Sequence, residues 1–315
     1  MQTPIIDDTT NKLQVVLLLI LSVSMVSSAS ILILLSSSPA LVIVFWRTLY
    51  GSLFMALIGL VRKDFSALRQ PTVKKNWYWL IIIGIILSFH FSTWFQSLRM
   101  TTVAASVVLV DSSPIFTAIL STIILGESLR RRSWIGVIIA VFGAVFLAWG
   151  DFGGTNITAL LGDLLALSGA LFLALYFIGG RRFAKGMPIT VYTSIVYLFA
   201  AITTLFLCIP FGYNVLVFQP TEVAIFIALA IFPTVLGHSV NNYLLTKVPA
   251  YVVSSAVLGE PIGATILAAI IFLQFPTIIT LIGFFVILAG VAIVLSDIAA
   301  KSQDKSLSLD DSNGS

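Results

Sequence analysis

The sequence is poor in charged residues and in cysteine. Charged residues make up 10% of the chain, whereas a soluble domain carries roughly 25%. The chain therefore lacks the charge needed to cover a surface that faces water. Its single cysteine, Cys208, excludes a disulfide within the chain.

The short motifs of common enzyme classes are also missing. The chain has no HExxH, no paired-aspartate metal motif, no P-loop and no GxSxG. We therefore expect no catalytic residues, no metal site and no cofactor, and we keep a membrane-embedded enzyme as a remote alternative. The net charge is only +4, and the lysines and arginines behind it concentrate on one side of the predicted membrane helices. We therefore expect no nucleic-acid partner.

Long apolar runs recur along the whole chain, which is 59% hydrophobic with a mean hydropathy of +1.09. A helix needs ~20 apolar residues to cross a bilayer. Ten runs approach this length: 13–35, 39–61, 78–98, 102–125, 133–149, 158–179, 190–211, 221–245, 249–273 and 276–297. Because backbone groups find no water inside a bilayer, these runs should be helices. The sequence predicts an all-α integral membrane protein with ten transmembrane helices.

Lysine and arginine are distributed unevenly around these helices. With the N-terminus inside, the inner segments hold fifteen of them and the outer loops only Arg99, while Arg47 lies within a helix. Cytoplasmic loops carry such an excess. We therefore expect a multi-pass protein of the cell membrane (inner or plasma membrane), with 1–12 and a disordered 298–315 both cytoplasmic. Because 1–12 lacks the basic region of a signal peptide, we expect the first helix to be retained.

The chain also repeats itself. A shift of 147 positions aligns residues 103–149 with 250–296 without a gap and pairs two prolines and four glycines: Pro114/Pro261, Gly136/Gly283 and Gly143/Gly290. A shift of 148 pairs Arg99 with Lys247 and His90 with His238. Each repeat, 13–149 and 158–297, then holds five helices. Because five is odd, the second repeat must enter the membrane from the opposite side, as in transporters with inverted repeats.

Several segments resemble the drug/metabolite transporter superfamily, and most closely its EamA-type branch. They are "FWRTLYGSLFMALIGL" (45–60), "HFSTWFQSLRMTTVAASVVLVDSSPIFTAILSTIILGE" (90–127), "LGDLLALSGALFLALYFIGGRR" (161–182) and "GHSVNNYLLTKVPAYVVSSAVLGEPIGATILAAIIF" (237–272). The resemblance implies ten helices, a central cavity between two halves, and secondary transport of small metabolites, often export. It does not imply a substrate. The chain departs from the pattern at Gln274, where a second LGE-like glutamate is usual.

Polar residues at mid-membrane depth are the candidates for substrate binding or coupling, because burying them in lipid is expensive. Arg47, His90, Asp111 and Glu260 fall at a similar depth along their helices. Glu260 precedes Pro261, and Asp111 and Ser112 stand just before Pro114; proline removes a backbone donor and kinks a helix. We interpret these kinks as cavity walls. For Glu260 the alternative is a protonated side chain that caps a neighbouring carbonyl.

The remaining candidates follow from helical spacing. His90 and Trp94 share one face of the predicted helix 78–98, and His238, Asn241 and Asn242 share one face of 221–245; these stripes line a cavity or join helices. Arg47 suits a substrate carboxylate, and Asp111 either binds substrate or forms an ion pair with Arg47. We expect Glu127 to contact the arginines at 130–132, and the paired glycines to form close-packed stripes, with a homodimer as one possible use of them.

Taken together, these features predict a secondary active transporter of a small metabolite, an amino-acid-like or other zwitterionic compound, working as an exporter by alternating access. Glu260 would couple protonation to transport, while Arg47 and Asp111 shape the site. A uniporter, an exchanger or a lipid flippase on the same fold remains an alternative. The expected partners are the small-molecule substrate and the lipid bilayer.

Overall fold

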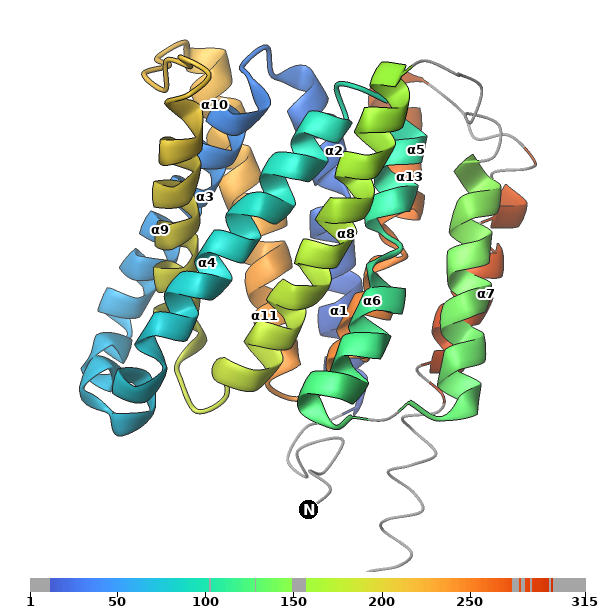
Figure 1. Cartoon of the computed structure of the whole chain (residues 1–315), viewed down its shortest axis with the longest axis horizontal. Helices are drawn as coiled ribbons and strands as arrows, with labels where there is room; N and C mark the ends of the chain where they lie inside the picture. The colour runs from blue at the N-terminus through green and yellow to red at the C-terminus, as the bar shows by residue number, and fades with distance from the viewer. Residues whose placement is uncertain are drawn as a thin grey trace, which may run out of the picture.

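The computed structural model describes residues 12–101, 103–127, 129–148, 157–273, 278, 281–283, 285–294 and 296. These residues contain helices and no strands, and the helices run side by side as one bundle (Figure 1). Large apolar side chains cover much of its outside, as at Leu57 (59% exposed), Phe142 (64%) and Phe206 (65%). Such a surface suits lipid rather than water.

The described residues of the first half form seven α-helices and two short distorted segments. They are α1 (Lys12–Val26), α2 (Ser28–Leu35), α3 (Ala40–Val61), η1 (Asp64–Arg69), α4 (Pro71–Ser97), α5 (Val103–Val110), α6 (Ser113–Leu120), η2 (Ser121–Leu125) and α7 (Arg131–Ala148). α4 begins several residues before the predicted start at residue 78. Pro71 occupies its first turn, where the missing N–H has no partner to lose.

The second half has a similar order. It contains α8 (Ile157–Phe183), α9 (Ile189–Cys208), α10 (Pro220–Leu229), η4 (Ala230–His238), α11 (Ser239–Leu245), α12 (Ala250–Val257) and α13 (Glu260–Phe272), followed by a helix at Leu281–Val294. Within 230–238 the backbone is a π-helix that contains Pro233. The sequence predicted one regular helix over 221–245, and the proline accounts for the distortion because it cannot donate a hydrogen bond to the preceding turn.

The predicted number of ten membrane helices is not confirmed. Among the described residues, eight spans are long and apolar enough to cross a membrane: Lys12–Leu35, Ala40–Val61, Val73–Ser97, Ala105–Leu125, Ile157–Phe183, Ile189–Cys208, Pro220–Leu245 and Ala250–Ile271. α7 and the shorter apolar helix Leu281–Val294 fall outside these eight. The structure therefore shows a multi-pass helical membrane protein with eight candidate spans.

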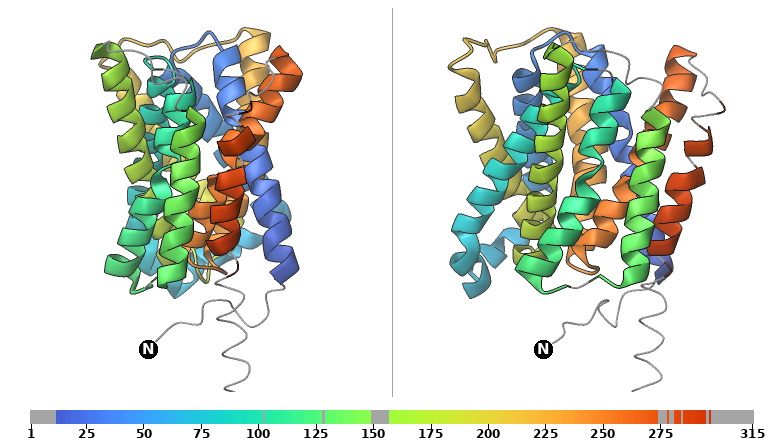
Figure 2. Two further views of the ribbon diagram at one scale, coloured as in Figure 1. Left: turned by 90° about the vertical axis from the view of Figure 1, so that its right-hand side faces the viewer. Right: turned by 45° about the vertical axis from the view of Figure 1, so that its right-hand side comes forward.

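Two of these spans are interrupted at equivalent positions. The first breaks at Asp111–Ser112, between α5 and α6, and the second at Leu258–Gly259, between α12 and α13. Both breaks are two residues long, differ by 147 positions and are followed by a proline at the second residue of the next helix, Pro114 or Pro261. The two broken helices pack against each other and run in opposite directions (Figures 1 and 2).

The two halves of the chain share a broad interface. α3 packs along α9, and α4 packs along α8 and α9. The connections at 62–70, 184–188 and 246–249 lie at the end of the bundle where α1 begins, and those at 36–39 and 209–219 lie at the other end (Figure 1). We call these the basic end and the opposite end, because lysines and arginines concentrate at the first. At the basic end Glu127 Oε1 lies 2.7 Å from Nε of Arg181, a partner outside the predicted triplet.

α7 and Leu281–Val294 lie at one edge of the bundle (Figure 2) and are held together by glycines. A Cβ at Gly290 would lie 2.5 Å from the main-chain N of Ala140 and 2.5 Å from the carbonyl oxygen of Gly136. A Cβ at Gly143 would lie 2.8 Å from the main-chain N of Ile287. The predicted close packing is confirmed at these positions, where it joins two helices of one chain. The homodimer stays a prediction.

This contact predicts the effect of adding one methyl group. Gly290→Ala should destabilise the protein by about 1–3 kcal/mol, because the new Cβ meets backbone atoms that cannot move aside. The melting midpoint of the purified protein in detergent measures this loss. Gly169→Ala is the control, since the nearest atom that its Cβ would meet is the side-chain Oγ1 of Thr93 at 3.2 Å, and the nearest backbone atom is 3.6 Å away. Equal midpoints for the two variants would contradict the proposed packing.

Candidate functional site

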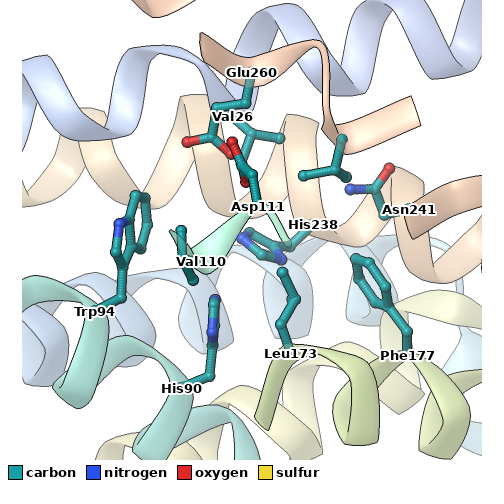
Figure 3. Close-up of a pocket in the computed structure, with 11 residues that line it drawn as sticks. Val26, His90, Trp94, Val110, Asp111, Leu173, Phe177, His238, Asn241 and Glu260 are labelled. Carbon is teal, nitrogen blue, oxygen red and sulfur yellow. The ribbon is translucent and has the colours of Figure 1, made fainter. Parts of the chain in front are cut away.

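A small cavity lies between the two broken helices, α4, α8 and the η4–α11 span (Figure 3). The side chains around it come from both halves of the chain: Val26, His90, Trp94, Val110, Asp111, Leu173, Phe177, His238, Asn241, Val257 and Glu260. The volume of this cavity is about 10 Å³, which is room for about one water molecule. The cavity is therefore nearly closed in this conformation.

The two helix breaks each bring one carboxylate to this cavity. Asp111 lies in the first break and Glu260 begins the helix after the second; they are 1% and 3% exposed. Figure 3 shows the two side chains next to each other, and they interact electrostatically. Asp111 Oδ2 and Glu260 Oε1 have no hydrogen-bond partner among the described residues. The broken helices thus place two acidic groups from opposite halves in one site.

Arg47 of α3 is fully buried and only partly satisfied. Its Nε donates to Oγ1 of Thr234, at 2.8 Å, and its guanidinium lies 3.9 Å from the ring centroid of Phe91. Thr234 belongs to the π-helical segment and donates in turn to the carbonyl oxygen of Leu229. Nη1 and Nη2 of Arg47 have no hydrogen-bond partner within the described part of the chain. The guanidinium is held in place with two donor nitrogens unused.

The predicted alternative of an ion pair between Arg47 and Asp111 is wrong. No ion pair of 4.0 Å or less joins Arg47 to a carboxylate among the described residues. The carboxylate that interacts electrostatically with Arg47 is that of Glu260. Both prolines stand where the helices break, as predicted. The position of a residue along a helix gave only the depth of its side chain and not its direction around the helix axis. The sequence therefore could not decide which carboxylate interacts with Arg47.

Two histidines and a tryptophan form an aromatic wall of the cavity. His90 and Trp94 stack with ring centroids 6.0 Å apart, and His90 lies 6.4 Å from His238. His90 Nδ1 is 2.9 Å from the carbonyl oxygen of Gly169, whereas both ring nitrogens of His238 and Nε1 of Trp94 have no partner in the described residues. No group of three metal-ligating side chains occurs within those residues.

The remaining candidates do not all reach the cavity. Asn241 lines it, and both polar atoms of its amide have no partner among the described residues. Asn242 instead donates to Tyr176 Oη and to the carbonyl oxygen of His238, so the predicted stripe of residues divides between two surfaces. Ser112 donates to the carbonyl oxygen of Leu109 and is not part of the lining.

Sequence analysis missed a group of buried tyrosines next to this site. Tyr176, Tyr192 and Tyr197 are each 0% exposed. Tyr197 Oη lies 3.0 Å from Oγ of Ser239, and Tyr192 Oη has no partner among the residues that the structure describes. The sequence did hold a signal for them, since all three tyrosines lie on predicted membrane helices. A hydroxyl buried there normally has a hydrogen-bond partner, so each tyrosine indicated a polar contact inside the bundle.

A second missed residue is Glu222, at the opposite end of the bundle. Its carboxylate is 4% exposed and accepts four hydrogen bonds from the connection between α2 and α3. The donors are Ser36 Oγ (2.5 Å), Ser37 N (2.9 Å), Ser37 Oγ (3.0 Å) and Ser38 Oγ (2.6 Å). Arg99 also donates to the carbonyl oxygen of Ser38, at 2.6 Å. We call this arrangement the Glu222 clamp; it ties the first half of the chain to the second.

The sequence is similar to several named transporters. Chain segments align with "Uncharacterized transporter YdfC" of Bacillus subtilis (strain 168), 24% identical over 79% of this chain and 79% of that protein, and with YetK of the same organism, 25% identical over 76% and 73%. A shorter match, 29% identical, to "Uncharacterized transporter YyaM" spans 42% of this chain and 45% of that protein. An "Uncharacterized transporter" of Archaeoglobus fulgidus is 27% identical over 67% of this chain and 73% of its own length.

A crystal structure of another protein has the same fold. It superposes with a TM-score of 0.75 over 90% of this chain and 96% of its own, at 21% identity. The EamA-like transporter family matches residues 13–149 and 160–296, which together are most of the sequence. The chain therefore belongs to the EamA-like transporter family and is a multi-pass membrane transporter of the drug/metabolite transporter type.

Proposed function

We propose that the chain is a secondary transporter that exports a small zwitterionic metabolite by alternating access at the Asp111–Glu260 cavity. The observation that carries this proposal is the convergence of unused polar atoms on one buried layer. Asp111, Glu260, His238 and Asn241 contribute such atoms from the cavity lining; Arg47 is not part of the lining but has such atoms too and interacts electrostatically with Glu260. Leaving a buried polar group unpaired costs about 1–3 kcal/mol, and a polar ligand is one way to pair several of them at once.

The chemistry of the layer favours a ligand with both charges. The two free Nη atoms of Arg47 suit a carboxylate, which guanidinium binds with two parallel hydrogen bonds. Asp111 and Glu260 suit an ammonium group. An amino-acid-like molecule carries both groups a few ångströms apart. The nearly closed cavity means that side chains or helices must move before such a molecule is admitted.

The broken helices supply a reason for alternating access. We propose that α7 and Leu281–Val294 complete ten membrane helices, arranged as two inverted repeats of five. The opposite directions of α5–α6 and α12–α13, which meet at the site, support this arrangement (Figure 2). Two related halves around one site can exchange conformations that open to either side.

The unequal charge of the two ends supports an orientation. We propose that the basic end faces the cytoplasm of the cell membrane, with both termini on that side, because cytoplasmic loops carry the excess of lysine and arginine. For the coupling mechanism we propose that Glu260 takes up and releases a proton as the substrate moves. Uniport, exchange and lipid flipping remain the competing mechanisms on this fold.

Transport by reconstituted protein tests the coupling. Proteoliposomes should take up at least one compound from an equimolar mixture of the twenty proteinogenic L-amino acids, and a gradient with an acidic interior should increase this uptake. Glu260→Gln should abolish the response to the gradient, because an amide cannot exchange a proton. Mass spectrometry of the vesicle contents measures the uptake.

Asp163→Asn is the matched control, since Asp163 is a carboxylate of α8 that is not part of the cavity lining. It should behave as the unmodified protein does. A Glu260→Gln protein that keeps its full pH response would refute coupling through this residue. Uptake of none of the amino acids would refute the zwitterion, while uptake without any pH response would favour uniport or exchange.

Arg47 offers a test of binding that separates function from stability. Arg47→Met removes a buried guanidinium and fills its space with apolar atoms, so the melting midpoint should stay level or rise. The half-saturation concentration for uptake should increase by about 10- to 100-fold, because charge-assisted hydrogen bonds to the substrate are lost.

The comparison variant is Arg181→Met, which removes a guanidinium already paired with Glu127. This variant should melt at a lower temperature and keep the half-saturation concentration of the unmodified protein. If Arg47→Met melts earlier and transports with unchanged affinity, Arg47 has a structural role only.

A further inference from the structure

The Glu222 clamp has a counterpart position at the basic end of the bundle. "QPTE" at 219–222 begins α10 and "QPTV" at 70–73 begins α4, a separation of 149 positions. The same separation relates "SSSP" at 36–39 to "KGMP" at 185–188, and the final proline of each is the N-cap of the next long helix, α3 or α9. We call 36–39 the serine connection and 185–188 the lysine connection. The two are equivalent segments at opposite ends of the bundle.

The chemistry of the two ends differs at these equivalent positions. At the opposite end, Ser36, Ser37 and Ser38 bind the carboxylate of Glu222. At the basic end, Val73 stands where Glu222 stands, and it belongs to the same buried apolar cluster as Ala184 and Met187. The lysine connection therefore has no carboxylate from this position to bind.

An open pocket lies beside the lysine connection. Its volume is about 580 Å³, against about 10 Å³ for the central cavity. Three of its residues are cationic, Arg62, Lys185 and Lys247, and one, Asp64, is acidic. Asp64 is already used, because it accepts a hydrogen bond from Thr190 Oγ1 at 2.6 Å and lies 3.4 Å from Nε of Arg62. The pocket keeps an excess of positive charge.

The cations of this pocket come from both halves of the chain. Arg62 follows α3 in the first half, whereas Lys185 and Lys247 belong to the second. Lys247 is also the counterpart of Arg99, which donates to the serine connection in the Glu222 clamp. A cationic residue thus stands at this position at both ends, whereas the position of Glu222 holds a carboxylate at one end and Val73 at the other.

We propose that this pocket binds a phosphate-bearing anion, which takes at the basic end the place that Glu222 has at the opposite end. Phosphate offers several acceptor oxygens to lysine and arginine donors at once. Two sources supply this group at the basic end of the bundle: the headgroup of an anionic lipid, and a soluble phosphate. Basic pockets between membrane helices commonly take lipid headgroups. By bridging the two halves, the anion would stabilise them against separation at this end.

Thermal unfolding of the full-length protein in dodecyl maltoside tests the site. The additives are dioleoylphosphatidylglycerol against dioleoylphosphatidylcholine, and sodium phosphate against sodium chloride at equal ionic strength. We expect phosphatidylglycerol, phosphate or both to raise the melting midpoint by about 2–4 °C at a concentration that fills the site. A response to phosphatidylglycerol alone identifies the lipid headgroup, and a response to phosphate as well identifies an accessible anion site.

Two pairs of substitutions distinguish the pocket from general charge effects. Lys185→Gln with Lys247→Gln should remove the increase, whereas Lys74→Gln with Lys75→Gln should keep it, because that pair carries the same charge on exposed residues outside the pocket lining. If the first pair fails to fold, Lys185→Gln alone, at an exposed position, should reduce the increase. The proposal is overturned if neither additive exceeds its control, or if the pocket variants respond as the unmodified protein does.

Discussion

An ion buried in an apolar helix bundle must be compensated by another charge, by hydrogen bonds or by a bound ligand. In this protein the compensation within the described residues is incomplete in one layer, where Arg47, Asp111 and Glu260 keep unpaired atoms. Much of the surrounding structure holds the polar groups of that layer in position. The two acids stand in or directly after breaks in two helices, and the π-helical segment places Thr234 within hydrogen-bond distance of Arg47. The polar layer therefore explains why the most distorted helices meet at the cavity.

The distortions also explain what the sequence could predict. Pro114 and Pro261 stand 147 positions apart, and both helix breaks occur two to three residues before them, because proline acts on the local backbone. The glycines were equally informative, since Gly136 and Gly290 lie where two helices approach closely. Membrane spans could be located from apolar runs, but α7 and Leu281–Val294 show that such runs do not settle how many cross the membrane.

Partner identity was harder to predict, because it depends on how each helix is rotated and on segments distant in sequence. Depth along the helix placed Arg47, Asp111 and Glu260 in one layer, yet it could not exclude an Arg47–Asp111 ion pair. Spacing put Asn241 and Asn242 on one stripe, whereas only the first lines the cavity. Glu222 lies at the start of a helix, where a carboxylate is unremarkable; its importance comes from serines more than 180 positions away, with separations of 184 to 186.

Differences between the repeats matter as much as their likeness. The position equivalent to Glu260 is Ser113, and the position equivalent to Asp111 is Leu258, so each half contributes one acid from a different place in the motif. A strictly repeated acid would give two symmetry-related carboxylates, whereas this displacement brings both to one small cavity beside a single arginine. The same logic applies at the ends, where Glu222 and Val73 are equivalent. Two exactly equivalent halves would carry the same groups at both clamp positions. Here a hydrogen-bonded carboxylate stands at one end and an apolar side chain at the other, so different interactions hold the two ends of the bundle together.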